Sequence, residues 1–142
     1  MGTLRQLYER GWQDLAEGRL EALLDLYDPD VEVKEAGQTF RGRDAVRAQY
    51  QSWLDAFSAM RVQILDVVES DEALAGEVRV TMTHTGALPT PNGPIPPTGR
   101  TVTLESCDVA RFRNGKVVSF HSYFDQFLLL AQLGLLPAPA TA

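Results

Sequence analysis

Hydrophobic and polar residues follow two different spacings along this chain. Between Thr3 and Glu17 apolar residues recur every three or four positions, which predicts an amphipathic helix over residues 3–17. The same spacing predicts helices over residues 20–27 and 126–133. Another predicted helix has Asp44 in its first turn and an apolar stripe from Val46 to Phe57.

Elsewhere the apolar residues alternate one by one, which is typical of strands. This spacing predicts strands over residues 31–35, 60–69 and 73–85, with a turn at 28–30. Residues 86–99 contain five of the eight prolines, so we expect a rigid loop without regular structure.

Residues 101–125 predict a long hairpin folded over Asn114-Gly115, a pair that favours tight primed turns. Alternation places four residues of the first strand on one face: Ser106, Asp108, Ala110 and Phe112. The corresponding residues of the return strand are Phe120, Ser122 and Phe124. Asp is depleted in the middle of strands, so the Asp108 carboxylate must be either solvated or placed in a pocket.

Helices early in the chain and antiparallel strands late predict an α+β fold. We expect a cone-shaped curved sheet, with the N-terminal helices closing a central cavity of the kind that binds small ligands. Residues 1–137 are predicted to form one domain, and residues 138–142 a mobile tail.

Composition narrows the possible functions. A net charge of −6 argues against nucleic-acid binding, and no apolar run is long enough for a membrane span. The N-terminus lacks the apolar core of a signal peptide, so a cytoplasmic location is expected. The single cysteine, Cys107, excludes an internal disulfide. Two histidines far apart in sequence give no sign of a metal site, and we expect no cofactor.

Several stretches together resemble the SnoaL-like polyketide and ester cyclases, which have the cone fold of nuclear transport factor two. They are WQDLAEGRLEALLDLYDPDVEVKEAG, FRGRDAVRAQYQSWLDAF, THTGALPTPNGPIPPTGRTV and CDVARFRNGKVVSFHSYFDQFLLLAQLG. The resemblance spans nearly the whole chain and implies that fold. For function it is less specific, because this fold carries many activities.

The resemblance also implies where chemistry is carried. The polyketide cyclases use an Asp seven residues after the hairpin glycine and a His seven residues before it. These positions hold Ser122 and Asp108 here, so the cyclase mechanism does not transfer directly. The ketosteroid isomerases of the same superfamily place a protonated Asp at the position of Asp108 and a general base at that of Glu35. Their oxyanion tyrosine would correspond to Gly11.

Asp108 and Glu35 are therefore the candidate catalytic residues, one acting as acid and one as base. Each has a structural alternative: Asp108 as a hydrogen-bonded structural acid, and Glu35 as a solvated charge at a strand end. His84 either contacts substrate at the cavity rim or holds the proline loop by a hydrogen bond. We expect His121 on the outer surface and Asp125 as a helix cap.

Ser122 is predicted to bind substrate inside the cavity. The remaining substrate-binding candidates are aromatic residues that belong to the core but also form cavity wall: Trp12, Tyr50, Trp53, Phe112, Phe120 and Phe124.

These residues suggest a cofactor-free protein that binds a hydrophobic cyclic carbonyl compound and catalyses proton transfer, such as cyclisation or isomerisation. The alternative is a non-catalytic binding module that lacks the cyclase residues. An epoxide hydrolase ranks last, because no Arg-x-Asp motif lies on the relevant strand. The outer sheet face, with Cys107, Val109, His121 and Tyr123, suggests a homodimer.

Overall fold

Four helices and six strands make up the computed structural model, which describes residues 3–136. In chain order they are α1 (Leu4–Ala16), α2 (Leu20–Asp25), β1 (Tyr27–Glu35), β2 (Gln38–Arg41), α3 (Arg43–Ala56), β3 (Phe57–Glu69), β4 (Ala73–His84), β5 (Thr101–Arg113), β6 (Lys116–Phe124) and α4 (Gln126–Gln132). The predicted tail, residues 138–142, lies outside the described residues.

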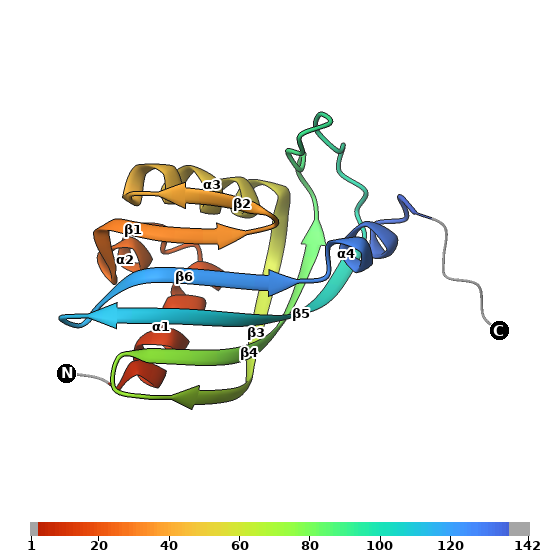
Figure 1. Ribbon diagram of the computed structural model, residues 1–142. Coiled ribbons are helices and arrows are strands. Elements are labelled where there is room, and N and C mark those ends of the chain that lie inside the picture. Colours follow the sequence, from red (N-terminus) through yellow and green to blue (C-terminus); the bar gives the residue numbers. More distant parts are fainter. Residues whose placement is uncertain (1–2, 137–142) are drawn as a thin grey trace.

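The strands form one curved sheet in the order β2-β1-β6-β5-β4-β3 (Figure 1). Neighbouring strands are antiparallel except β1 and β6, which run parallel. Helices α1, α2 and α3 lie together on one face of the sheet (Figure 1). The α+β class and the cone-shaped curved sheet under N-terminal helices are therefore confirmed.

Three details of the sheet differ from the sequence prediction. Strand β3 begins at Phe57, which was assigned to the preceding helix, instead of at residue 60, because α3 ends at Ala56 and Phe57 has an extended backbone. Strand β2 was not predicted, because it has only four residues and little burial to create an alternating pattern. Strand β1 begins at Tyr27 instead of Val31, and its pairing with β6 is irregular between Tyr27 and Glu32. The turn predicted at residues 28–30 lies within this irregular stretch. Asp30 donates its backbone N–H to the Asp28 side chain at 2.9 Å, as in a turn.

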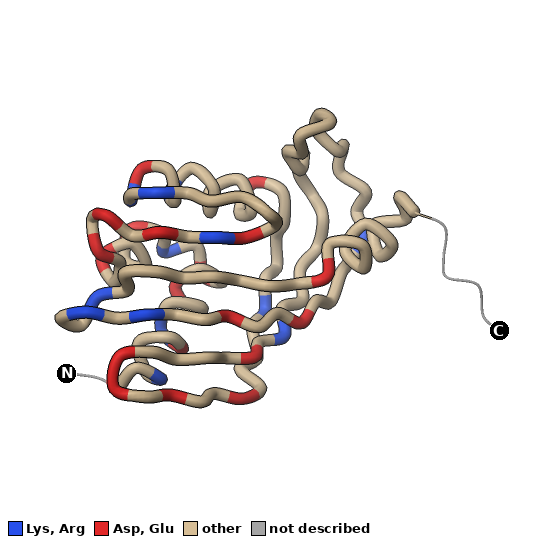
Figure 2. Tube along the Cα trace, in the orientation of Figure 1, with Lys and Arg blue, Asp and Glu red and all other residues tan. Residues whose placement is uncertain are grey.

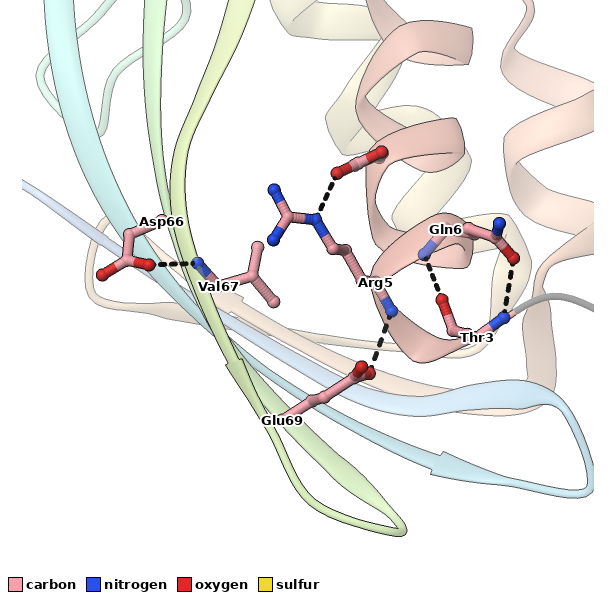
Figure 3. A network of polar contacts seen from close by, with 7 residues as sticks. Thr3, Arg5, Gln6, Asp66, Val67 and Glu69 are labelled. Carbon is pink, nitrogen blue, oxygen red and sulfur yellow. Dashed lines mark hydrogen bonds and ion pairs between the residues drawn. The ribbon is translucent and has the colours of Figure 1, made fainter.

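Helix α1 is fixed at its N-terminus by a capping box. Thr3 accepts the backbone N–H of Gln6 at 3.1 Å, and the Gln6 side chain accepts the backbone N–H of Thr3 at 2.9 Å (Figure 3). The backbone N–H of Arg5 is bound by Glu69 at the end of β3, at 3.1 Å (Figure 3). The first turn of α1 is thus attached to the edge strand β3. This contact helps to fix the orientation of the helix over the sheet.

The β5–β6 hairpin has the predicted geometry. Asn114 and Gly115 both have positive φ, 53° and 74°, as a primed turn requires. Burial alternates along β5, and Asp108, Ala110 and Phe112 are all on the buried face. The same alternation leaves Cys107 exposed on the outer face.

The loop of residues 86–99 carries no charged residue and extends from the sheet near α4 (Figure 2). Its base is a short β-bridge between Leu88 and Ile95. Leu88 is buried in a hydrophobic cluster that includes Leu129 and Leu133 from the C-terminal segment. No helix within residues 3–136 combines the length and apolar character needed to cross a membrane.

Candidate functional site

A cavity lies between the inner face of the sheet and helices α1–α3. Its empty volume is about 950 Å³, open solvent at its mouth included. Eight aromatic residues contribute to its lining: Tyr8, Trp12, Tyr27, Tyr50, Trp53, Phe112, Phe120 and Phe124. Six of these were predicted as substrate-binding residues, whereas Tyr8 and Tyr27 were not. Such an apolar hollow with few polar groups is the usual form of a small-molecule site.

Asp108 lies on the inner face of β5, fully buried beneath the cavity lining. Its Oδ2 atom accepts two hydrogen bonds from α1, from the Tyr8 hydroxyl at 2.6 Å and from Trp12 Nε1 at 2.9 Å. Tyr8 and Trp12 are four residues apart and therefore project from the same side of the helix. Asp108 Oδ1 has no partner among the described residues.

Burial controls protonation at this carboxyl. It raises the pKa of Asp108 from 3.8 to about 6, against the opposing effect of its hydrogen bonds, of which that from Tyr8 is the largest. Burial, and then the neighbouring Asp108 charge, also raise the pKa of the Tyr8 phenol. Near neutral pH, Tyr8 therefore keeps its proton, whereas Asp108 can change its protonation state.

Gly76 makes room for Tyr8. It lies on β4 directly opposite Asp108, and a Cβ atom there would be 2.5 Å from the Tyr8 ring. A glycine inside a strand often marks such a close approach, so Gly76 was a signal for this contact in the sequence. It could not identify Tyr8 as the partner, because that contact depends on how α1 crosses the sheet. The superfamily comparison pointed to Gly11 for the oxyanion tyrosine, and Tyr8 lies one turn earlier.

Glu35 is the second carboxyl of the site, at the end of β1. Its Oε1 atom accepts hydrogen bonds from Trp53 Nε1 at 2.7 Å and Gln49 Nε2 at 2.8 Å. Burial raises its pKa, and these two donors oppose the effect. Glu35 lines the cavity, unlike Asp108, and no described residue forms a hydrogen bond with Oε2. One carboxylate oxygen is therefore held and the other is available to a ligand.

Ser122 lies between the two acids. It pairs with Asp108 across β5 and β6, and the last β1–β6 pair, Lys34 with His121, brings Glu35 next to it. Glu35, Ser122, Asp108 and Gly76 thus form a row across four strands. Because strands are about 4.8 Å apart, the Cα atoms of the two acids are about 10 Å apart.

Tyr27 and Tyr50 form another polar pair in the lining. Their hydroxyl groups are 2.9 Å apart, and either can be the donor. Both side chains are buried, which raises both pKa values. The pair has one hydroxyl proton that is not used internally and can be donated to a ligand oxygen.

His84 was predicted as a substrate contact or as an anchor of the proline loop. It is fully buried and lies outside the cavity lining. Its Nδ1 atom accepts the backbone N–H of Thr98 at 3.1 Å and is 3.0 Å from the Thr98 hydroxyl. Burial lowers the pKa of His84, which favours a neutral ring that accepts at Nδ1. This position matches the anchoring alternative.

Two further residues lie where the sequence predicted. His121 is on the outer face, with Nε2 3.0 Å from Glu32. Asp125 caps α4 by accepting the backbone N–H of Leu128 at 3.0 Å. Within residues 3–136, no three His, Cys, Asp or Glu side chains are grouped as metal ligands would be.

Comparisons with known proteins agree with this architecture. The sequence profile of a family described as "SnoaL-like domain" matches residues 4–120. Among curated proteins, no sequence matches the chain significantly.

Solved structures of similar fold include AclR from Streptomyces galilaeus, a candidate hydroxylase, with TM-score 0.80 and 22% identity over 94% of this chain and 86% of that one. IdmH from Streptomyces antibioticus, a candidate polyketide cyclase, has TM-score 0.74 and 24% identity over 92% of this chain and 97% of that one. An NTF2-like protein from Burkholderia pseudomallei has TM-score 0.75 and 23% identity over 94% of this chain and 98% of that one. At these identities the likeness shows a common fold.

Proposed function

Because the chain belongs to the SnoaL-like domain family, we propose that its cavity binds a hydrophobic cyclic carbonyl compound and catalyses proton transfer next to the carbonyl group. Glu35 is the base, and Tyr8, positioned by Asp108, is the hydrogen-bond donor to the carbonyl oxygen. The observation that carries this proposal is the Glu35 carboxylate, which lines the aromatic cavity, is held through Oε1 and has no hydrogen bond to a described residue at Oε2. Candidate polyketide cyclases of the same fold support the choice of ligand.

The reaction requires one proton acceptor and one proton donor. Glu35 Oε2 takes the proton from the carbon beside the carbonyl, the electron pair of that C–H bond forms a carbon–carbon double bond, and the π pair of the carbonyl group moves to its oxygen. The developing negative charge receives a hydrogen bond from Tyr8. In an unsaturated ligand, the proton returns from Glu35 to the far carbon of the conjugated enolate while the carbonyl group re-forms, which shifts the double bond and gives isomerisation. If the enolate carbon instead attacks a second carbonyl carbon, a ring forms and the resulting alkoxide takes the proton from Glu35.

The protonation state of Asp108 determines whether Tyr8 can donate. An ionised Asp108 accepts a hydrogen bond from the Tyr8 hydroxyl, which has only one proton to donate. A protonated Asp108 can donate to the Tyr8 oxygen instead, which frees the Tyr8 proton for the ligand. Since the pKa of Asp108 is about 6, this exchange lies close to physiological pH. Asp108 is thus a positioning residue in the proposed mechanism, and Tyr8 and Glu35 are catalytic.

A panel of hydroxyanthraquinones and steroid enones tests the proposal. Thermal stabilisation identifies ligands, and turnover of those ligands is then measured. Glu35→Gln should lower kcat by about 10²- to 10⁴-fold while leaving binding intact, because the amide cannot accept the proton. Asp108→Asn should remove the change of turnover around pH 6, because the amide does not titrate whereas the pKa of the Asp108 carboxyl is about 6. Glu77→Gln is a matched control, since Glu77 is exposed on β4.

A non-catalytic binding module is the second candidate function. The observation that favours it is that Ser122 and Asp108 occupy the positions where the cyclases carry other residue types. Stabilisation by the panel without any turnover would support this module. Turnover that is equal in wild type and Glu35→Gln would reject the proposed base.

A further inference from the structure

The charges around the cavity are unbalanced. Glu35 lines it and Asp108 lies just beneath, yet no Lys, Arg or His occurs among the lining residues that the structure describes. A carboxylate removed from water is costly unless a positive charge or several hydrogen bonds compensate it. Glu35 receives hydrogen bonds on one oxygen only. The missing positive charge can be supplied by the ligand.

We propose that the part of the cavity bounded by Glu35, Trp53 and Phe124 binds an alkylammonium group, so that the substrate is a carbonyl compound bearing a tertiary or quaternary amine. This inference rests on the proposed function for the carbonyl half of the ligand. Binding of the ammonium half of the ligand depends only on this corner of the cavity.

Two aromatic rings and a carboxylate meet at this corner. The rings of Trp53 and Phe124 have centroids 5.9 Å apart and planes inclined by 75°. Trp53 also donates to Glu35 Oε1, which fixes the indole beside the acid. Trp53 also stacks on Phe57, with ring centroids 5.6 Å apart, so these contacts already cover part of the ring surface. A ring face that they leave open and the carboxylate oxygens are both negative, and together they attract a cationic methylammonium group.

A cation also affects the state of Glu35. Burial raises the pKa of this carboxyl in the unliganded cavity and so favours its neutral form. A positive charge beside Oε2 stabilises the ionised form, which is the form that a general base requires. An ammonium group near the carbonyl would also acidify the carbon between them, where Glu35 takes the proton. Anionic ligands would meet the same carboxyls unfavourably.

The corner is next to the protein surface. Glu35, Ser122 and Phe124 also line a second recess, formed by residues 34–39, the end of β6 and Gln126. The recess contains a lysine, Lys34, whose Nζ lies 3.9 Å from Glu32 Oε1. The net charge of −6 favours the approach of cations over anions.

A pair of ligands with the same shape separates charge from size. Choline and 3,3-dimethylbutan-1-ol differ only in the exchange of the positive nitrogen for a neutral carbon. Fluorescence is a direct reporter, because both tryptophans of the chain line the cavity. We expect choline to bind about tenfold more tightly than the neutral alcohol, as a partly desolvated cation–π contact would give.

Glu35→Gln should abolish that preference, since the amide keeps the shape but loses the charge, and the affinity for 3,3-dimethylbutan-1-ol should stay unchanged. Glu77→Gln, on the outer face, should retain the full preference. Equal affinity for the two ligands, no binding of choline, or a preference that survives Glu35→Gln would each overturn the inference. Choline preference without turnover of any carbonyl compound would contradict the proposed catalysis and leave the ammonium site standing.

Discussion

At the scale of single residues, two carboxyls with raised pKa values differ in access to the cavity. Asp108 is covered by Tyr8 and Trp12 and can act on a ligand only through them. Glu35 lines the cavity and keeps one oxygen free of hydrogen bonds to described residues. The proposed mechanism therefore gives the same chemical group two tasks, positioning at Asp108 and proton transfer at Glu35.

The raised pKa of Asp108 predicts a pH-dependent stability. The folded value is about 6 and the ordinary value is 3.8. Between these values the folded protein binds more protons than the unfolded chain, so its free energy of unfolding falls as the pH rises, by ~3 kcal/mol for this residue. Urea unfolding of wild type and Asp108→Asn across this range should show the difference between the two proteins change by that amount. Parallel curves would contradict the assigned pKa shift.

At the scale of secondary-structure elements, the site depends on the close approach of α1 to the sheet. Tyr8 on α1 packs on Gly76 of β4 and reaches Asp108 on β5, so three elements meet at one point. The capping box at Thr3 and the contact of Arg5 with Glu69 fix the same helix at its start. A side chain at position 76 would push α1 away from the acid that it covers.

Gly76→Ala is therefore expected to destabilise the fold by ~1–3 kcal/mol, the cost of overpacking a tight contact. Tyr8 cannot easily move, because Asp108 holds its hydroxyl. The effect is measured by urea unfolding. Gly11→Ala is the matched control, since its Cβ would be 3.3 Å from a flexible Leu23 methyl group and alanine favours a helix.

A double variant with Tyr8→Leu tests whether the Gly76→Ala effect passes through this contact. The cost of Gly76→Ala should be smaller in the Tyr8→Leu background, because the clashing ring is absent. Equal costs in both backgrounds would show that the strain lies elsewhere in β4.

At the scale of the whole molecule, the outer sheet face is the surface not covered by α1–α3. Two threonine pairs, Thr81 with Thr103 and Thr83 with Thr101, connect β4 and β5 by hydrogen bonds. Tyr123 on β6 is 59% exposed and adds a large aromatic side chain to this face. This mixed polar and apolar face is the one from which a homodimer was predicted.

We predict a homodimer through this face. Sedimentation velocity over a range of protein concentrations should show a species of twice the chain mass. Tyr123→Glu should shift the population toward the monomer, because it would bury a charge in the interface. A wild-type monomer at every concentration would reject the prediction.

The sequence predicted much of this protein because many of its signals are local. The Asn114-Gly115 turn, the alternation along β5 and the helical spacing of Tyr8 and Trp12 each arise within a few residues. Strand β2 escaped prediction because a short, exposed strand carries little pattern. The six aromatic candidates could be placed in the cavity because they sit on elements that must face the core.

By itself, then, the sequence determined the α+β class and every element except β2. It also identified Asp108 and Glu35 as candidate carboxyls, with the alternative that each is solvated or structural. Only the tertiary structure decided that Tyr8 and Trp12 bind Asp108, that Glu35 and not Asp108 lines the cavity, and that His84 holds the loop. These outcomes depend on contacts between residues up to 100 positions apart. Periodicity fixes which way a side chain points from its own element, but the partner it meets is set by how the elements pack.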